Sequence, residues 1–259
     1  MRILFLGDIV VQSGVSAVCA CTPMLQKQYQ PDITIANGEN AADGKGMTKE
    51  LYNRLKAAGI DLITLGNHAF SKRAFLFDTD DCMDIIWPAN IGTYAPSRPV
   101  LIRLVNGKRL AVLNILGNVF MNADYEDPIL VTKQILRHIS ADVILIDFHA
   151  EATSEKSIYF QYFKDRVTAI IGTHTHVQTA DEKVENGCAF ITDAGMCGPY
   201  DSVLGRDRNE AMDHAITGCS HYLPSDNASL ICGLVIDIDD HTNRAVSIQR
   251  IQLRPGPND

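Results

Sequence analysis

Polar side chains of the types that bind metal ions follow five apolar stretches of this sequence. The motifs are GD, NGEN, GNH, DFHAE and GTHTH, in that order along the chain. Carboxylate, amide oxygen and imidazole nitrogen are all metal ligands, and a set without thiolate suits manganese, iron(II) or zinc. The carboxylate, amide and imidazole residues of the five motifs are Asp8, Asn37, Glu39, Asn40, Asn67, His68, Asp147, His149, Glu151, His174 and His176.

Each motif alone also has an ordinary structural explanation. An aspartate after a strand often caps a turn or a helix, and a single histidine such as His149 is often a buried core residue. The His-x-His pair of GTHTH is the strongest sign, because Gly172 and two threonines let both rings turn toward one point. Five such motifs in one chain are difficult to explain by packing. We interpret the histidines outside them as surface or core residues: His138, His214, His221 and His241.

The motifs end short apolar, β-branched runs, which are typical of strands buried on both faces of a sheet. In open α/β sheets, ligands bind beyond the carboxyl ends of the strands, so parallel pairing brings the motifs to one edge. Strands of this kind are predicted at residues 2–8, 32–37, 61–67, 142–149, 167–174 and 189–195.

Helical patterns lie between these runs, at residues 14–29, 48–59 and 153–165. Thr48 is predicted to cap the second of these helices, and a glycine ends it. A further helix is predicted to begin at Asp127-Pro128, where an N-cap residue is followed by proline at the first helical position.

Antiparallel pairs are predicted near the middle and at the end of the chain. One is a hairpin over residues 100–116 that turns at Asn106-Gly107. The other pairs residues 228–239 with residues 245–253. We therefore expect one α/β domain over residues 1–259, with parallel strands in the middle and antiparallel strands at the flanks.

Composition limits the class of protein. The chain has 259 residues, of which 46% are hydrophobic and 21% charged, and its formal net charge is −8. This is enough for a large core. An acidic chain without a Lys/Arg-rich block is not expected to bind the backbone of long nucleic acids. A small anionic substrate remains compatible with it if a metal supplies local positive charge.

Seven cysteines without a C-x-x-C pair predict reduced, mostly buried thiols and a cytoplasmic location. The N-terminal run MRILFLGDIV reaches Asp8 too early for a signal peptide. No run approaches the roughly 18 apolar residues of a transmembrane helix, so we expect no membrane association. The oligomeric state is left open, and a homo-oligomer is compatible with the sequence.

The motifs resemble those of the calcineurin-like metallophosphoesterase superfamily, which has GD, GNH, a mid-chain histidine and G-x-H-x-H in this order. More closely, the chain is similar to the YmdB-type bacterial phosphodiesterases over nearly its whole length. The most specific stretches are DFHAEATSEK (147–156) and GTHTHVQTADE (172–182). The others are LFLGDIV (4–10), ANGENAADGKG (36–46), LGNH (65–68) and ITDAGMCGPYDSVLG (191–205).

The resemblance implies both a fold and an activity. The fold is α/β, a four-layer αββα sandwich of two mixed sheets. The activity is hydrolysis of a small phosphodiester, with 2′,3′-cyclic nucleotides as the substrate class, by a hydroxide that bridges two divalent metal ions. Iron or manganese is expected, and zinc or magnesium is an alternative.

Roles for the ligands follow from one departure from the superfamily pattern. Most relatives begin with D-x-H, whereas this chain reads Asp8-Ile9-Val10 and lacks that histidine. We infer that Glu39 bridges the two metals and that the amide oxygen of Asn40 replaces the missing ligand. The first metal then has the ligands Asp8, Glu39, Asn40 and His176, and the second has Glu39, Asn67, His149 and His174.

His68 is the predicted catalytic residue. Two metals about 3.5–4 Å apart clamp the phosphate and hold the attacking hydroxide. His68 is then available to stabilise the phosphate and to protonate the leaving oxygen. The alternative is that it only braces Asn67. Further residues are expected to orient the ligands or to line the substrate pocket: Asp147, Glu151, Thr173, Thr175, Gly198 and Asp201.

Two departures concern the pocket itself. After GNH the chain reads Ala69-Phe70-Ser71, where the family pattern has an aromatic residue and an aspartate. Cys197 stands where a threonine is usual. Both are expected to change the pocket rim or the substrate preference.

Other functions are compatible with parts of the pattern. The nearest rival is a phosphomonoesterase or nucleotidase, and a non-catalytic metal-bound regulatory protein is a second. Metal-dependent amidohydrolases also carry His-x-His, but on an early strand of a (β/α)₈ barrel rather than after GNH. A dinucleotide-binding fold is disfavoured, because the first strand leads into GDIVVQSG and not G-x-G-x-x-G.

Overall fold

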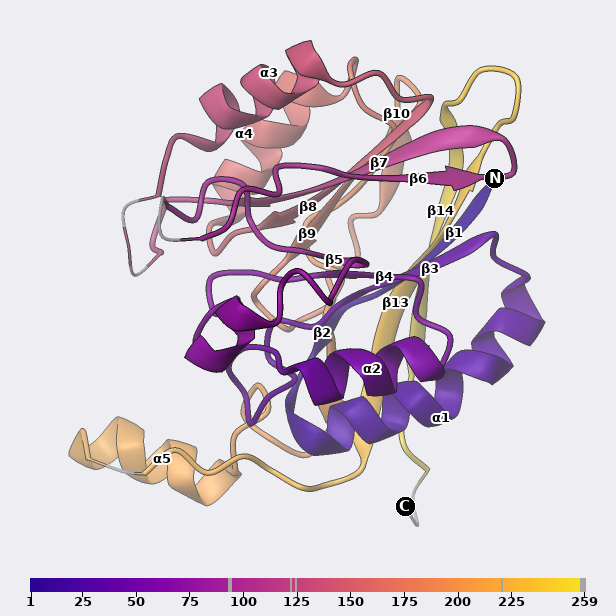
Figure 1. Ribbon diagram of the computed structural model, residues 1–259. Helices are drawn as coiled ribbons and strands as arrows, with labels where there is room; N and C mark the ends of the chain where they lie inside the picture. The colour runs from indigo at the N-terminus through magenta and orange to yellow at the C-terminus, as the bar shows by residue number, and fades with distance from the viewer. Residues whose placement is uncertain (93–94, 122, 124, 220, 257–259) are drawn as a thin grey trace.

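Two mixed β-sheets pack face to face in the computed structural model, which describes residues 1–92, 95–121, 123, 125–219 and 221–256 (Figure 1). The first sheet contains β1 (Arg2–Leu6), β2 (Asp8–Ile9), β3 (Ile33–Asn37), β4 (Leu62–Thr64), β5 (Ile85–Ile86), β12 (Met196–Pro199), β13 (Ser229–Ile238) and β14 (Ala245–Leu253). Their order is β2-β12-β13-β1-β3-β4-β5, and β14 pairs with β13. Strands β1, β3, β4 and β5 run parallel, whereas β13 is antiparallel to its partners.

The second sheet contains β6 (Leu101–Val105), β7 (Lys108–Leu116), β8 (Val143–His149), β9 (Ala169–Thr173), β10 (Lys183–Glu185) and β11 (Cys188–Ile191). Its order is β10-β11-β9-β8-β7-β6. The four central strands are parallel and both edge strands are antiparallel, as the hairpin over residues 100–116 predicts for one edge.

Helices cover the outer face of each sheet. The helices α1 (Val11–Tyr29) and α2 (Lys49–Ala57) lie on the first sheet, and α3 (Pro128–His138) and α4 (Thr153–Phe163) lie on the second (Figure 1). A short 3₁₀-helix, η1 (Arg73–Phe77), follows β4. The predicted four-layer αββα sandwich of two mixed sheets is therefore confirmed.

Alternation along β1 shows how the layers are held together. Ile3 and Phe5 belong to the apolar cluster between the two sheets, whereas Leu4 and Leu6 belong to the cluster under α1 and α2. Successive side chains of a strand point to opposite faces, so a fully apolar strand packs into the hydrophobic clusters on both sides of its sheet. A third cluster lies between the second sheet and α3 and α4.

Two of the predicted helix starts are confirmed by their caps. The side chain of Thr48 accepts the N–H of Leu51 at 3.3 Å at the start of α2. The side chain of Asp127 accepts the N–H groups of Ile129 and Leu130 at the start of α3, with Pro128 at its first position. These bonds satisfy amide groups that a helix leaves without partners at its N-terminus.

Several elements differ from the prediction. The C-terminal strand β13 lies inside the first sheet between β12 and β1, so the expectation that this pair flanks the sheet is wrong. Helix α1 begins at Val11 rather than at residue 14. The strands predicted at residues 61–67 and 189–195 end early, because their polar ends turn away from the sheet to form loops. The short strands β2, β5 and β12 were not predicted.

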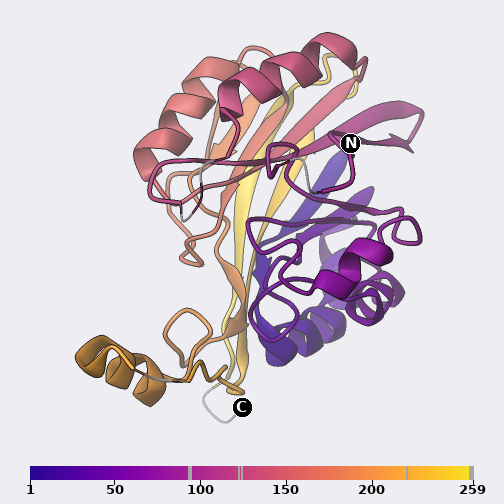
Figure 2. The ribbon, with the colours of Figure 1, turned by 60° about the vertical axis from the view of Figure 1, so that its left-hand side comes forward.

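One helix stands apart from the sandwich. Helix α5 (Arg208–Thr217) projects from the body of the molecule in both views, and none of its residues is buried (Figures 1 and 2). No helix among the described residues is long and apolar enough to cross a membrane. All seven cysteines are free, and four of them are buried: Cys82, Cys188, Cys197 and Cys232.

Candidate metal centre

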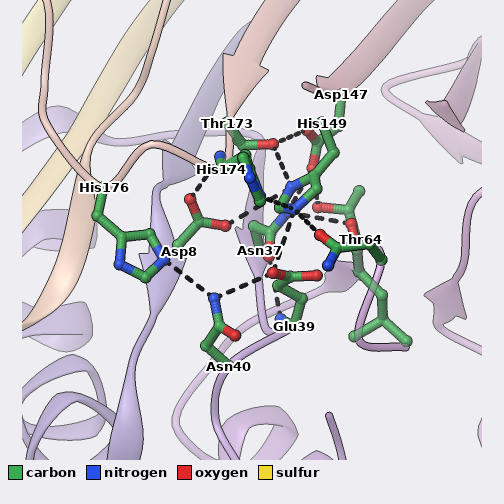
Figure 3. Close-up of polar contacts among 12 residues, drawn as sticks. Asp8, Asn37, Glu39, Asn40, Thr64, Asp147, His149, Thr173, His174 and His176 are labelled. Atoms are coloured by element: carbon green, nitrogen blue, oxygen red, sulfur yellow. Dashed lines mark hydrogen bonds and ion pairs between the residues drawn. The ribbon is translucent and has the colours of Figure 1, made fainter. Parts of the chain in front are cut away.

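Loops that follow strands of both sheets bring the candidate side chains together (Figure 3). From the first sheet, Asp8 begins β2, and Glu39 and Asn40 follow β3. From the second sheet, His149 ends β8 and His174 follows β9. The group therefore exists only because the two sheets pack against each other.

The ring nitrogen Nε2 of His149 is the point where four candidates meet. It lies 3.1 Å from Oε1 of Glu39, 3.1 Å from Oδ1 of Asn67 and 3.0 Å from Nδ1 of His174. At most one hydrogen on Nε2 can serve these three atoms, so several lone pairs face one another. Ligand atoms of Glu39, His149 and His174 all lie within 4.8 Å of one another. The structure thus brings together the residues predicted to hold the second metal.

Asn40 connects this group to His176. Its Nδ2 donates to Oε1 of Glu39 at 3.1 Å and lies 3.0 Å from Nε2 of His176. A half turn of the amide exchanges its nitrogen and oxygen, and ligation through the amide oxygen requires that orientation. The position of this side chain is therefore compatible with the prediction that Asn40 replaces the histidine ligand of the D-x-H pattern.

Asp8 supplies the observation that tests whether these residues fit a metal ion. Its side chain is fully buried, and Oδ2 accepts the N–H of His174 at 2.9 Å. Its Oδ1 has no hydrogen-bond partner among the described residues, and Nδ1 of His149 lies 3.9 Å from it, beyond hydrogen-bond distance. A buried carboxylate oxygen without a partner is costly, and a bound cation removes that cost. Oxygen and imidazole donors without thiolate suit manganese, iron or zinc, so the residues fit a divalent metal centre.

The ionisable side chains of the group shift one another's pKa values. Burial opposes the charged form of His149, but the carboxylates of Glu39, Asp8 and Asp147 together outweigh burial and raise the pKa of His149 to about 9. Burial also opposes ionisation of Glu39, yet the charge of His149 lowers the pKa of that carboxyl below its usual range. Burial, assisted by the charge of His149, lowers the pKa of His174 to about 3. Burial raises the pKa of Asp8 well above its usual range. A bound cation favours ionised carboxylates and neutral imidazoles here.

Thr173 and Asp147 hold the ring of His149 from its other side. Nδ1 of His149 lies 2.8 Å from the hydroxyl of Thr173, and that hydroxyl donates to Oδ1 of Asp147 at 2.6 Å. Asn37 donates to the other oxygen of Asp147 at 2.9 Å, and its Oδ1 accepts the N–H of Glu39 at 3.0 Å. Asn37 therefore links both sides of the group, a role that its sequence context, a turn after a strand, did not indicate.

A buried ion pair supports the loop that carries His-x-His. Nζ of Lys156 lies 2.9 Å from Oδ2 of Asp193, both side chains are buried, and Nζ also donates to the carbonyl of Thr173. Asp193 accepts the N–H of Thr175 at 3.0 Å and its hydroxyl at 2.8 Å. Thr175 thus acts on the loop backbone and not directly on an imidazole. Only the family resemblance of the stretches that hold Lys156 and Asp193 pointed to them.

The backbone of this loop is strained at both histidines. His174 has φ +99° and His176 has φ +65°, a region that residues with a Cβ rarely adopt. Such conformations persist where surrounding bonds impose them, and they cluster at functional sites. The Lys156–Asp193 pair supplies such bonds here.

The close approach of Glu39 and His149 requires glycine at position 66, in the GNH motif. A Cβ at this position would lie 2.2 Å from Oε2 of Glu39 and 2.4 Å from Nε2 of His149. Any side chain here would therefore occupy the space between two candidate ligands.

A cavity of about 290 Å³ opens beside the group. Its lining includes Leu204, which belongs to the family-like stretch at residues 191–205, and also Arg206 and Tyr222, which no motif in the sequence indicated. The full set is Val10, Glu39, Asn40, Gly44, His68, Glu151, His174, Thr175, His176, Leu204, Arg206 and Tyr222.

His68 lines this cavity, as a residue that touches substrate must. Its N–H donates to Oε2 of Glu39 at 3.0 Å, and its Nδ1 lies 3.3 Å from the hydroxyl of Ser71. Burial lowers the pKa of His68. Glu151 lines the cavity as well, with Oε2 3.2 Å from Nε2 of His174.

Gly198 and Asp201 lie outside the cavity lining. Gly198 is buried in β12, where a Cβ would lie 2.9 Å from that of Val10. Asp201 forms an ion pair at 2.7 Å with Arg208. No hydrogen bond or ion pair links either residue to a candidate ligand among the described residues.

The two departures from the family pattern have different surroundings. Phe70 is buried and packs edge-on against Trp87 with ring centroids 5.4 Å apart, and Ser71 contacts His68. Cys197 is buried in the core with its thiol 3.1 Å from the carbonyl oxygen of Cys232. The expectation that Cys197 affects the pocket rim is therefore wrong, because β12 directs this side chain inward.

Comparison with known proteins connects this arrangement to a family. Residues 4–251 match the family model described as YmdB-like protein. The chain belongs to the YmdB-like family. A 2′,3′-cyclic-nucleotide 2′-phosphodiesterase of Bacillus subtilis is 42% identical over 257 residues, which cover 98% of this chain and 97% of the relative.

Two solved structures are similar over most of their length. A protein described as a novel phosphatase from Mycoplasma pneumoniae has a TM-score of 0.93 at 31% identity, over 98% of this chain and 93% of that one. A hypothetical protein of Thermus thermophilus has a TM-score of 0.92 at 32% identity, over 98% of this chain and 99% of that one. The predictions of the family and of an enzyme of the phosphoesterase class are confirmed.

Proposed function

We propose that this YmdB-like protein is a dimetal phosphodiesterase that hydrolyses small cyclic nucleotides of the 2′,3′ type. The observation that carries the proposal is the convergence of Glu39, Asn67 and His174 on Nε2 of His149, beside a fully buried Asp8 oxygen that has no hydrogen-bond partner among the described residues. The substrate class comes from the name of the Bacillus subtilis relative. A site built from both sheets also supports the proposal that residues 1–259 act as one domain, and seven free thiols support a cytoplasmic location.

The ligand assignment follows from the two halves of the group. Oε1 of Glu39 lies 3.1 Å from Nδ2 of Asn40 and 3.1 Å from Nε2 of His149. These contacts with one member of each ligand set support a bridging role for the carboxylate. We assign Asp8, Glu39, Asn40 and His176 to one ion and Glu39, Asn67, His149 and His174 to the other. Two divalent ions, manganese or iron first, supply an activated water and positive charge toward a phosphate when they are bound.

His68 is assigned to the leaving group. Burial lowers its pKa, so the ring is neutral near pH 7 in the free protein. An anionic phosphate in the cavity favours the charged form, because an opposite charge nearby raises the pKa of an imidazole. A bound phosphate therefore favours the form of His68 that can donate a proton to the leaving oxygen.

The test is purification under anaerobic conditions, metal analysis and a substrate panel. The panel contains 2′,3′-cyclic AMP, 3′,5′-cyclic AMP and p-nitrophenyl phosphate esters. We expect two metals per chain and preferred hydrolysis of 2′,3′-cyclic AMP. The Glu39→Gln variant is expected to lose metal and activity together, and full metal content with normal turnover in that variant would exclude the bridging role.

A phosphomonoesterase activity is the second candidate, favoured by the description of the Mycoplasma pneumoniae structure as a phosphatase. Preference for p-nitrophenyl phosphate over the cyclic nucleotides would support it. Metal content without turnover on any member of the panel would instead support a regulatory protein.

A further inference from the structure

The segment that carries the projecting helix α5 also supplies part of the cavity wall. Leu204 and Arg206 precede α5, and Tyr222 follows it. Figure 2 shows α5 away from both sheets, so only the base of this segment reaches the site. Backbone bonds between Val203 and Arg206 hold the base together.

This base contacts a candidate ligand directly. The carbonyl oxygen of Leu204 lies 3.2 Å from Nδ1 of His176. A carbonyl only accepts, so Nδ1 carries the hydrogen and Nε2 of His176 is left free toward Asn40. The segment is therefore fixed relative to the candidate metal centre.

Arg206 is the lining side chain with a permanent positive charge. Its Nε and Nη2 donate to Glu210 at 3.0 and 2.6 Å, which holds the guanidinium in place. Its Nη1 has no hydrogen-bond partner among the described residues. The carboxylate side chains in the lining are those of Glu39 and Glu151.

Tyr222 presents an aromatic ring to the same cavity. The guanidinium carbon of Arg206 lies 5.6 Å from the centre of the ring. The hydroxyl end of Tyr222 rests against Gly44, where a Cβ would lie 2.0 Å from it. Gly44 has φ +86°, so glycine provides both the backbone conformation and the room for the ring. Even so, Tyr222 remains 43% accessible.

We propose that Arg206 and Tyr222 form the nucleoside subsite of the cavity. The base stacks on Tyr222, and Nη1 of Arg206 donates to the sugar-phosphate. The inference rests on the proposed phosphodiesterase function. Aromatic rings stack with any base, and guanidinium groups bind phosphates. The volume of about 290 Å³ is at the lower end of small-molecule sites, which favours a mononucleotide.

The test compares substrates that share a five-membered cyclic phosphate but differ in the base. We would measure kcat and KM of wild type, Tyr222→Ala and Tyr222→Phe on 2′,3′-cyclic AMP and on glycerol 1,2-cyclic phosphate. Tyr222→Ala is expected to raise KM for 2′,3′-cyclic AMP by about tenfold and to leave the base-free substrate unchanged. Tyr222→Phe keeps the ring and is expected to behave as wild type. Leu223→Ala is the matched control, because Leu223 is exposed on the same segment and does not line the cavity.

A binding measurement keeps this inference separate from the proposed function. Calorimetry with 3′-AMP and with glycerol 2-phosphate needs no turnover. Tyr222→Ala is expected to weaken 3′-AMP about tenfold and to leave glycerol 2-phosphate unchanged. Equal effects on both ligands, or on neither, would overturn the subsite. A wild type that binds 3′-AMP through Tyr222 but hydrolyses no phosphodiester would overturn the proposed function and leave the subsite standing.

Discussion

The hydroxyl of Thr173 lies 2.8 Å from Nδ1 of His149 and donates its single hydrogen to Asp147. Because that hydrogen is used, the bond to His149 requires a hydrogen on Nδ1. The nitrogen Nε2 is then the one that faces Glu39 and Asn67 and that can bind a metal. Partners of this kind fix the ring orientation and tautomer of ligating histidines.

Replacing Thr173 by valine removes this constraint without changing the size of the side chain. We expect metal affinity to fall by about 10–100-fold, because outer partners of ligating histidines contribute that much. The oxygen of Asp147 that loses its donor adds a stability loss of about 1–3 kcal/mol. Metal titration and urea unfolding measure the two effects. Thr173→Ser keeps the hydroxyl and should retain affinity, so an equal loss in both variants would contradict the role of the hydroxyl.

Gly66→Ala tests whether the space between Glu39 and His149 is the metal site. The added methyl group would lie within 2.4 Å of both side chains, so they must move apart. We expect loss of metal binding and of hydrolysis with the fold retained. Metal analysis and circular dichroism on the same sample measure this, and a variant that folds and binds two metals would refute the site.

The sequence predicted which residues converge at the candidate site, because most of the candidate ligands lie in short motifs at strand ends. The apolar runs predicted most strand positions, and parallel pairing brings the polar ends of neighbouring strands together. The motifs lie on two sheets, however, so the expectation of one common sheet edge is wrong. The assignment of Asn40 needed a comparison with the D-x-H pattern, because an asparagine in a loop has no ligand signature of its own.

Other features of the site and the fold could not be predicted from the hydrophobic periodicity of the sequence. Arg206 and Tyr222 lie outside the motifs, and the base of a projecting segment brings them to the cavity. Lys156 lies on a helix where a solvated lysine is the ordinary interpretation, and its burial depends on a tertiary contact with Asp193. Strand β13 enters the middle of the first sheet, which local pattern cannot distinguish from an edge position.

The buried pair of Lys156 and Asp193 should make a large contribution when only one partner is removed. Lys156→Met leaves the carboxylate of Asp193 buried without its cation, and we expect a loss of about 3–5 kcal/mol in unfolding free energy. The loop of Thr175 depends on the same carboxylate, so metal binding should weaken as well. Urea unfolding of the single variants and of Lys156→Met/Asp193→Asn forms a double-mutant cycle. Strictly additive losses would show that the two charges do not interact.

Metal binding should release a proton from His149. Its pKa of about 9 in the metal-free protein means that Nε2 is protonated at pH 7, whereas His174, with a pKa of about 3, is already neutral. A metal must displace the proton on His149, so affinity should rise about tenfold per pH unit between about pH 6 and 8 and level off above the pKa.

The same proton can be counted directly. Manganese titrations by calorimetry at pH 7, in buffers with different ionisation enthalpies, should show about one proton released per His149-bound ion. Thr173→Ser, which retains the bond to Nδ1, should release the same number. Affinity that is independent of pH over this range, with no proton released, would contradict this prediction. It would mean that His149 is neutral before the metal binds and that Glu39 does not stabilise a protonated His149 ring.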